Sequence, residues 1–300
     1  MRGILINRSS ILQATVLLAL LFAGQFIGTF IAVIGALTQI SPWTADINKI
    51  LEFMTTSPQI IRQTQFMGTL FGILFPALCA AYMFSGNYKN YLVLETATTG
   101  RTILWTFLSM IVILPAINFI AWLNSQIPLP QTLIDMEERS ARLLETMLDS
   151  NLIGTYFMNI LIIAVLAAFS EEILFRGVFL RVLIRKKSHI YIMVWVTAII
   201  FSMMHAQFSG FFPRMLLGAY FGYLLCRTKT MWVPIFAHFV HNFIQVTAIW
   251  IFRTDGKMLE SFEIIGTGTT IWLTPLSIIL FFYCYRRIII ENKPKSYNGR

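Results

Sequence analysis

Long apolar runs recur along this chain and favour folds in which helices lie in a lipid bilayer. The first run covers about residues 11–34. An α-helix needs about 20 apolar residues to span a bilayer, whereas the apolar part of a signal peptide has about 7–15. We therefore expect a retained membrane helix here. Only 12% of the 300 residues are charged, against roughly 25% in soluble proteins. The sequence predicts an all-α, polytopic membrane protein.

Seven further apolar runs follow, so we expect about eight membrane helices, with a catalytic pocket between the fourth and the seventh. Pro115 lies inside the third run and should kink that helix. An even number of spans places both termini on one side. Most lysines and arginines between the runs fall on that side, which predicts cytoplasmic termini in the cell membrane. The predicted spans cover about residues 11–34, 66–84, 103–123, 155 to just before 181, 190–205, 212–226, 232–251 and 269–285.

The polar segment between the third and fourth runs has a helical pattern of its own. Residues 132–148 place leucines and methionines on one face and charged residues on the other, so we expect an amphipathic helix on or near the membrane surface. It is either a lid that gates substrate entry or a connecting interfacial helix. We divide the chain into an N-terminal part with three spans (1–154), a catalytic helical core (155–252), and a last span with a basic tail (253–300).

The formal net charge of +9 raises the question of a nucleic-acid partner. The positive-inside rule explains this charge, and no soluble segment interleaves basic and aromatic residues, so we expect no nucleic acid to bind. A basic cluster over 181–187 either sets the topology or binds anionic lipid. The cysteines Cys79, Cys226 and Cys284 lack CxxC spacing. We interpret them as buried small hydrophobic residues rather than as disulfides or metal ligands.

Two adjacent carboxylates, Glu171 and Glu172, interrupt the fourth apolar run. A carboxylate near the centre of a membrane helix costs about 2.5–3.5 kcal/mol, so such a residue predicts a functional site. Glu172 and Arg176 are four residues apart on one helix face and can form an ion pair. The guanidinium could donate two parallel hydrogen bonds to the carboxylate in a bidentate contact. Glu171 points about 100° away from that pair. It is therefore the carboxylate left free for chemistry.

Polar residues in later apolar runs are the candidate partners of these carboxylates. His205 ends the fifth run, and His238, His241 and Asn242 lie in the seventh. Polar groups in hydrocarbon must find partners, so we expect one wet pocket between helices. His238 and Asn242 are four residues apart and share a helix face. We interpret His241, although near enough to border the pocket, as a packing histidine with satisfied hydrogen bonds.

These groups suit hydrolysis by an activated water molecule. Glu171 would act as the general base and His205 would position the water. His238 and Asn242 would donate hydrogen bonds to the developing oxyanion. Glu171, His205 and His238 would also make a two-histidine, one-carboxylate set for a divalent metal such as zinc. Because HExxH spacing is absent, we expect no cofactor, with metal binding as the alternative.

Three motifs in order on successive predicted helices resemble the CPBP family of intramembrane proteases. That family includes the CAAX prenyl endopeptidases and bacterial proteins linked to bacteriocin self-immunity. The resemblance covers about residues 155–250. It implies that Glu171 and His205 activate the water, that His238 and Asn242 stabilise the oxyanion, and that Glu172 and Arg176 support the site. The motifs read Glu171-Glu172-x-x-x-Arg176, Phe201-x-x-x-His205 and His238-x-x-x-Asn242.

The leading hypothesis is therefore an intramembrane endopeptidase that cuts a peptide, a prenylated protein or a membrane protein in the bilayer. A membrane scaffold or immunity protein could use the same pocket only for recognition. A proton-coupled transporter could use the carboxylates and histidines as a relay. Transport is favoured by inverted repeats, and the two halves show no convincing symmetry. A scaffold should tolerate Glu171→Gln, whereas a protease should not.

Overall fold

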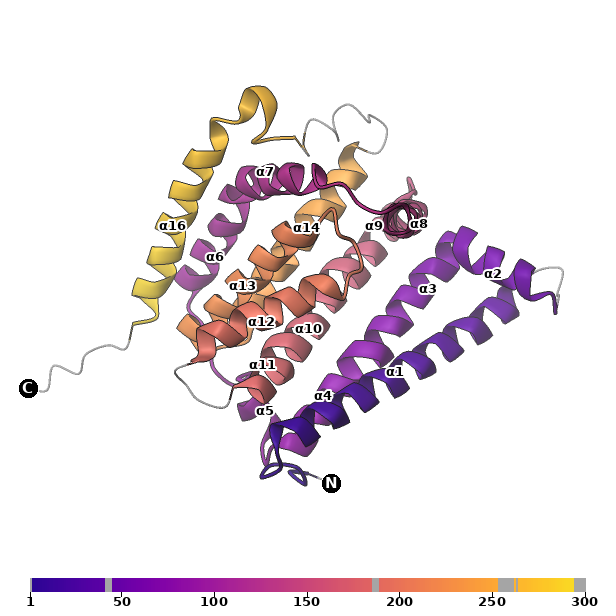
Figure 1. Cartoon of the computed structure of the whole chain (residues 1–300), viewed down its shortest axis with the longest axis horizontal. Coiled ribbons are helices and arrows are strands. Elements are labelled where there is room, and N and C mark those ends of the chain that lie inside the picture. The colour runs from indigo at the N-terminus through magenta and orange to yellow at the C-terminus, as the bar shows by residue number, and fades with distance from the viewer. Residues whose placement is uncertain (1, 41–44, 185–188, 253–261, 263, 294–300) are drawn as a thin grey trace, which may run out of the picture.

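A computed structural model describes residues 2–40, 45–184, 189–252, 262 and 264–293 (Figure 1). Within these residues every regular element is a helix and no strand occurs. This confirms the predicted all-α class, and the chain is a polytopic membrane protein. Its helices form two groups that lie side by side in Figure 1: an N-terminal hairpin and a larger helical core.

The N-terminal hairpin consists of one long helix packed against a second, interrupted one. Helix α1 (Ser10–Gln39) is followed by the short α2 (Ile47–Thr56) and then by α3 (Pro58–Thr69), η1 (Leu70–Leu74) and α4 (Phe75–Phe84). Gly28 permits the two partners to approach closely, because a Cβ atom there would lie 2.9 Å from the Met67 carbonyl oxygen. Small residues at such crossings are typical of membrane helices.

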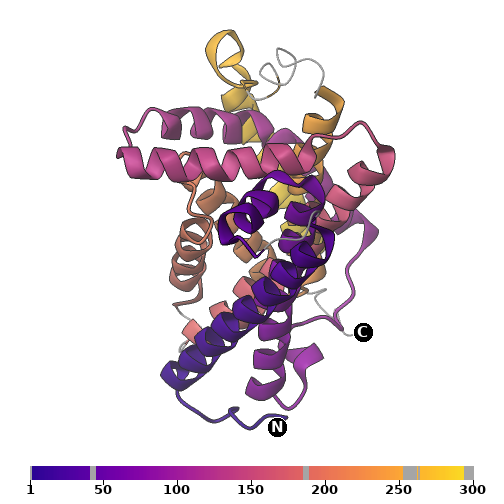
Figure 2. The ribbon, with the colours of Figure 1, turned by 90° about the vertical axis from the view of Figure 1, so that its right-hand side faces the viewer.

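A bent pair of helices leads from the hairpin to the surface. After α5 (Tyr88–Tyr91), α6 (Gly100–Val112) and α7 (Leu114–Ser125) meet at an angle of 42°. The bend lies beside Pro115, as predicted, because proline has no N–H to continue the hydrogen-bond ladder. Helix α8 (Gln131–Leu148) follows. Figure 2 shows α8, in pink, running across the molecule at a steep angle to α1.

The core contains a long helix that carries the glutamate pair. It runs through α9 (Ile153–Asn159), η2 (Ile160–Leu166), α10 (Ala167–Glu172), η3 (Ile173–Phe179) and α11 (Leu180–Leu183). The π-helical segments η2 and η3 flank the glutamates, and π-helical turns are frequent at functional sites. The remaining core helices are α12 (Ile190–Met203), α13 (Phe211–Thr228) and α14 (Trp232–Phe252). A 3-10 turn, η5 (Gly268–Thr270), precedes the last helix, α16 (Leu273–Glu291).

The predicted count of eight spans is not confirmed. Each predicted span matches a helix or a helical segment, but only five described helices are long and apolar enough to cross a membrane, or six with the bent pair α6 and α7. Helix α12 has 14 residues, which reach about 21 Å at about 1.5 Å per residue, short of the roughly 30 Å hydrocarbon core. Helix α13 carries Arg214 and Arg227 and is also outside the set.

Candidate active site

Glu172 and Arg176 form a buried ion pair at the centre of the core. Arg176 Nη1 donates to Glu172 Oε1 at 2.8 Å, and Nη2 donates to the Gly218 carbonyl oxygen at 2.7 Å. The two side chains are 0% and 1% exposed. The pairing agrees with the spacing on the helix, but the two arginine nitrogens serve different acceptors, so the contact is not bidentate. Because Gly218 lies on α13, Arg176 also links two core helices.

Glu172 also holds His238. The Glu172 Oε1 atom lies 2.9 Å from His238 Nδ1. A carboxylate only accepts hydrogen bonds, so this contact assigns a proton to Nδ1 and aims Nε2 at the opposite side. His238 Nε2 lies 3.8 Å from Glu171 Oε2. The supporting carboxylate therefore fixes the ring orientation of a predicted catalytic histidine.

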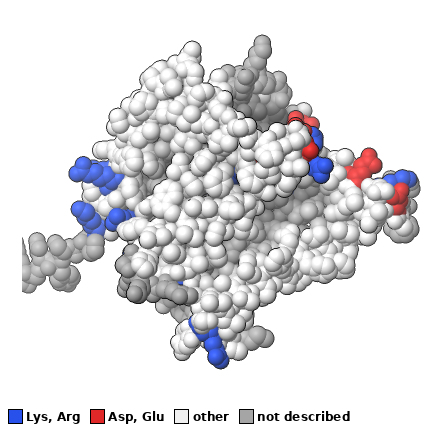
Figure 3. All heavy atoms as spheres, viewed as in Figure 1, with Lys and Arg blue, Asp and Glu red and all other residues white. Residues whose placement is uncertain are grey.

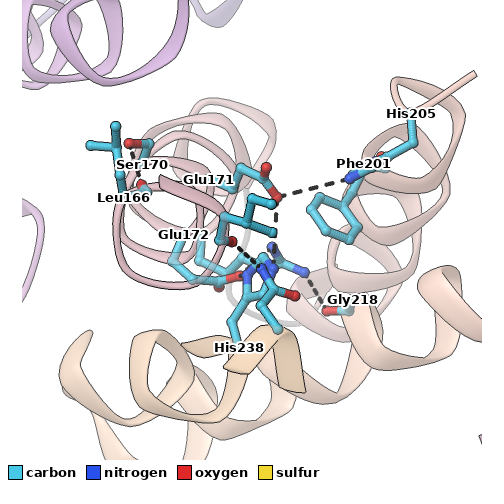
Figure 4. Close-up of polar contacts among 11 residues, drawn as sticks. Leu166, Ser170, Glu171, Glu172, Phe201, His205, Gly218 and His238 are labelled. Atoms are coloured by element: carbon cyan, nitrogen blue, oxygen red, sulfur yellow. Dashed lines mark hydrogen bonds and ion pairs between the residues drawn. The ribbon is translucent and has the colours of Figure 1, made fainter. Parts of the chain in front are cut away.

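Glu171 faces two histidines at once (Figure 4). Its Oε2 atom lies 4.0 Å from His205 Nε2 and 3.8 Å from His238 Nε2. These separations exceed a direct hydrogen bond and suit a bridging water molecule. Glu171 Oε2 is buried and has no hydrogen-bond partner among the described residues. Of the two adjacent carboxylates, Glu172 is therefore paired with Arg176, whereas the Glu171 Oε2 atom is not hydrogen-bonded to any described residue.

A second contact assigns the tautomer of His205. His205 Nδ1 lies 2.8 Å from the Phe201 carbonyl oxygen. A carbonyl accepts hydrogen bonds but cannot donate them, so Nδ1 carries the proton, and Nε2 of the neutral ring presents a lone pair towards Glu171. The chain turns sharply after His205, since Ala206 adopts a left-handed conformation with φ +50°, which is uncommon for residues other than glycine.

Asn242 and His241 both line the same cavity as Glu171. Asn242 Nδ2 donates one hydrogen to the Ile163 carbonyl oxygen at 2.9 Å, which leaves its second amide hydrogen free for another acceptor. His241 differs from our interpretation of a satisfied packing histidine. Its Nδ1 atom is buried without a hydrogen-bond partner in the described part of the chain. His241 is thus a further candidate for contact with a ligand.

The cavity has a volume of about 760 Å³ and extends well beyond the predicted core. The predicted core helices α10, α12, α13 and α14 contribute Glu171, Phe201, Leu217 and His238 to its wall. The outer part is lined by helices that the motifs do not cover, and this part is largely apolar. From α2, α3 and α8 it includes Leu51, Met54, Ile61, Leu143, Leu144 and Met147.

The loop after His205 is fixed by residues that sequence reasoning missed. The Glu137 carboxylate on α8 accepts hydrogen bonds from the backbone N–H groups of Phe208 and, at 2.8 Å, of Ser209. Asn124 on α7 donates to the Phe208 carbonyl oxygen at 2.8 Å. Arg214 donates to the Gln207 side chain at 2.6 Å. In the sequence, nothing distinguishes Glu137 from the other charged residues on the polar face of this amphipathic helix.

Among the described residues, no group of three or more His, Cys, Asp or Glu side chains could hold a metal ion. Cys226 and Cys284 are buried, but Cys79 is exposed, so its assignment as a buried residue was wrong. It lies on the outward face of α4 in the hairpin. Residues 185–187 of the basic cluster lie outside the described residues.

Comparison with known proteins agrees with the motifs. Residues 153–244 match the family model described as Type II CAAX prenyl endopeptidase Rce1-like. A protein of Bacillus subtilis (strain 168) named "Putative membrane peptidase YdiL" is 31% identical over 85 residues, which are 28% of this chain. The match spans about a third (34%) of that relative's length. No solved structure matches the chain.

The matched segment contains all six predicted site residues, from Glu171 to Asn242. It also coincides with the long glutamate-bearing helix and with α12, α13 and the first half of α14. The resemblance predicted from the three motifs is confirmed by this match. Over residues 153–244, the helical core of this chain is therefore similar to the Type II CAAX prenyl endopeptidases of the Rce1-like family.

Proposed function

We propose that this protein is an intramembrane endopeptidase in which Glu171 and His205 activate a water molecule. The observation that carries the proposal is the position of Glu171 Oε2, which faces the Nε2 atoms of His205 and His238 at 4.0 and 3.8 Å on the wall of a large cavity. The matched family and the relative named as a membrane peptidase support the same reaction class. The name of that relative identifies no substrate.

The tautomers define how a water molecule would be held. Water has two hydrogens, and the two groups facing it, the Glu171 carboxylate and the unprotonated Nε2 of His205, are both acceptors. Water would donate one hydrogen to each and direct an oxygen lone pair at the peptide carbonyl carbon. Glu171 would take up one proton as the carbon–oxygen bond forms, and later pass it to the leaving amine.

The oxyanion would be stabilised from α14. Because His238 Nδ1 donates to Glu172, a hydrogen bond from Nε2 requires the imidazolium form of this ring. Asn242 would contribute its second amide hydrogen. In known oxyanion holes the loss of one such donor costs about 2.7–4 kcal/mol of transition-state stabilisation.

The substrate would lie in the cavity between the hairpin and the core. Its outer wall of leucine, methionine and isoleucine side chains suits an apolar segment or a lipid chain, while the polar end at Glu171 takes the peptide bond. A prenylated C-terminus, a short peptide and a membrane-protein segment all fit this description. A divalent metal at Glu171 remains the alternative mechanism and belongs in the test.

The test is cleavage of a quenched peptide library, including a farnesylated C-terminal peptide, by purified protein in detergent. Wild type, Glu171→Gln and the surface control Glu145→Gln are compared with and without a chelator. We expect wild type and Glu145→Gln to cleave equally with or without the chelator, and Glu171→Gln to be inactive. Activity that the chelator abolishes would refute the metal-free mechanism. Equal cleavage by Glu171→Gln and wild type would refute the role of Glu171. A folded but inactive wild type would favour the scaffold.

A further inference from the structure

A second cavity lies on the side of the core away from Glu171. It has a volume of about 440 Å³ and is lined almost entirely by apolar side chains of α7, α12, α13 and α16. Leu217 is the one described residue that lines both this groove and the catalytic cavity. Two of its lining residues on α16, Ile278 and Phe282, are 40% and 59% exposed. Since α16 is long and apolar enough to cross a membrane, the groove opens towards hydrocarbon.

One end of the groove is polar and aromatic. Tyr223 and Tyr285 line this end, and the Tyr223 hydroxyl accepts a hydrogen bond from Trp195 Nε1 at 3.1 Å. Tyrosine and tryptophan are enriched where membrane helices meet the headgroup region. This end lies near the last turn of α13 and the last turns of α16. It is the end at which a lipid headgroup would sit if its chain occupied the groove.

An arginine completes this polar end. Arg227 follows Tyr223 by one helical turn, and its guanidinium lies near the Tyr285 hydroxyl. It also lies 5.8 Å from the centre of the Tyr191 ring. No described carboxylate lies within ion-pair distance of Arg227, whereas Arg287 on α16 pairs with Glu291 at 3.8 Å. Arg227 therefore presents an uncompensated positive charge beside the aromatic end of the groove.

The surface charge fits the same ligand. Figure 3 shows lysine and arginine side chains gathered at the edge of the molecule over the end of α16, with no acidic side chain among them in this view. Arginine binds phosphate through parallel N–H donors and stacks on aromatic rings, and both features are present at Arg227. A neutral ligand would leave the positive charge of Arg227 without a counter-charge.

We infer that this groove is a binding site for an anionic phospholipid. An acyl chain lies along the apolar wall beside Ile278, and the phosphate lies against Arg227 and the Tyr285 hydroxyl. The site is independent of the proposed protease activity, because it shares no polar residue with the catalytic cavity. Binding at this position would connect α13, which carries Gly218 of the catalytic core, to α16 outside the matched family segment.

The test is the retention of phosphatidylglycerol and phosphatidylcholine with the same acyl chains by purified protein, measured by native mass spectrometry. Wild type should retain phosphatidylglycerol preferentially. Arg227→Gln should lower that preference about fivefold, the effect of one basic residue near an anionic headgroup. Lys229→Gln, two residues away, is the matched control and should leave it unchanged. Arg227→Lys should restore part of the preference.

A second pair of variants tests the acyl chain. Ile278→Trp fills the groove and should lower retention of both lipids, whereas Ile279→Trp, on a neighbouring exposed residue outside the groove, should not. Thermal unfolding in detergent shows whether each variant is folded. Equal retention of the two lipids by wild type would overturn the proposal. Equal effects of Arg227→Gln and Lys229→Gln, or of Ile278→Trp and Ile279→Trp, would also overturn it. Displacement of the lipid by inorganic phosphate alone would instead identify a free-anion site.

Discussion

Two Glu–Arg pairs with the same helical spacing offer a direct test of the buried network. Glu172 and Arg176 pair at 2.8 Å and are 0% and 1% exposed. Glu138 and Arg142 on α8 pair at 3.3 Å and are 58% and 63% exposed. Both pairs are separated by four residues on a helix, so they differ mainly in burial. We therefore compare the substitutions Glu172→Gln and Glu138→Gln.

The expected loss in the free energy of unfolding for Glu172→Gln follows from the buried charge of Arg176, which the substitution leaves without its partner. Breaking a buried ion pair by removing one partner costs about 3–5 kcal/mol, because the other charge stays buried without compensation. Arg176 would keep its hydrogen bond to the Gly218 carbonyl oxygen and its contact with the Phe201 ring, 4.8 Å from the guanidinium carbon. The glutamine oxygen could also still accept a hydrogen bond. We therefore expect a loss near the lower limit, about 3 kcal/mol. Glu138→Gln should cost about 0.3–0.5 kcal/mol.

The assay is denaturant-induced unfolding in mixed micelles, followed by tryptophan fluorescence and circular dichroism. The double variant Glu172→Gln/Arg176→Gln provides a further check, because removal of both charges should recover a large part of the loss. Free energies of unfolding that fall equally for Glu172→Gln and Glu138→Gln would refute the argument from burial. A double variant no more stable than Glu172→Gln would show that an uncompensated charge is not the cause.

Two further predictions concern packing around the site. Glu137→Gln should raise amide hydrogen exchange in the loop after His205, because a neutral amide binds the two backbone N–H groups less strongly than a carboxylate does. It should also change kcat more than KM, by lowering kcat. The exposed control Glu145→Gln should have neither effect, and unchanged hydrogen exchange in Glu137→Gln would contradict the contact. Gly218→Ala places a Cβ atom 3.1 Å from both the buried guanidinium and a phenyl ring of α12. It should lower the free energy of unfolding by about 1–3 kcal/mol. Gly154→Ala, with nothing within 4 Å, should not, and equal unfolding curves would exclude close packing at Gly218.

Local spacing made part of the site predictable from sequence. The pairing of Glu172 with Arg176 depends only on a separation of four residues within one helix, so helical geometry was sufficient. The approach of His205 and His238 to Glu171 required a different argument, that polar groups in an apolar environment gather together. Both arguments concern residues that stand out against apolar neighbours. This contrast made the residues at the core of the site predictable from the sequence.

Residues in polar segments do not stand out in this way. Glu137 contacts a loop about 70 positions later in the chain, and its amphipathic helix contains several acidic residues of similar appearance. The polar stretch 37–65 contains α2 and the start of α3, which supply Leu51 and Ile61 to the cavity wall. The predicted span count is not confirmed for a related reason. Hydropathy locates apolar helices, but length and packing decide which of them cross the membrane.

The chemical role of His238 shows most clearly what the side-chain contacts add. The sequence predicts a donor to the oxyanion, whereas the contact between His238 Nδ1 and Glu172 makes that role depend on a second proton at Nε2. Glu172 Oε1 also accepts a hydrogen bond from Arg176, so one carboxylate oxygen contacts both the ring and the guanidinium. Glu171 faces the opposite nitrogen of the same ring at 3.8 Å. The imidazole of His238 therefore lies between the two adjacent glutamates, and in the proposed mechanism they have different tasks: Glu172 orients the ring, whereas Glu171 acts on water.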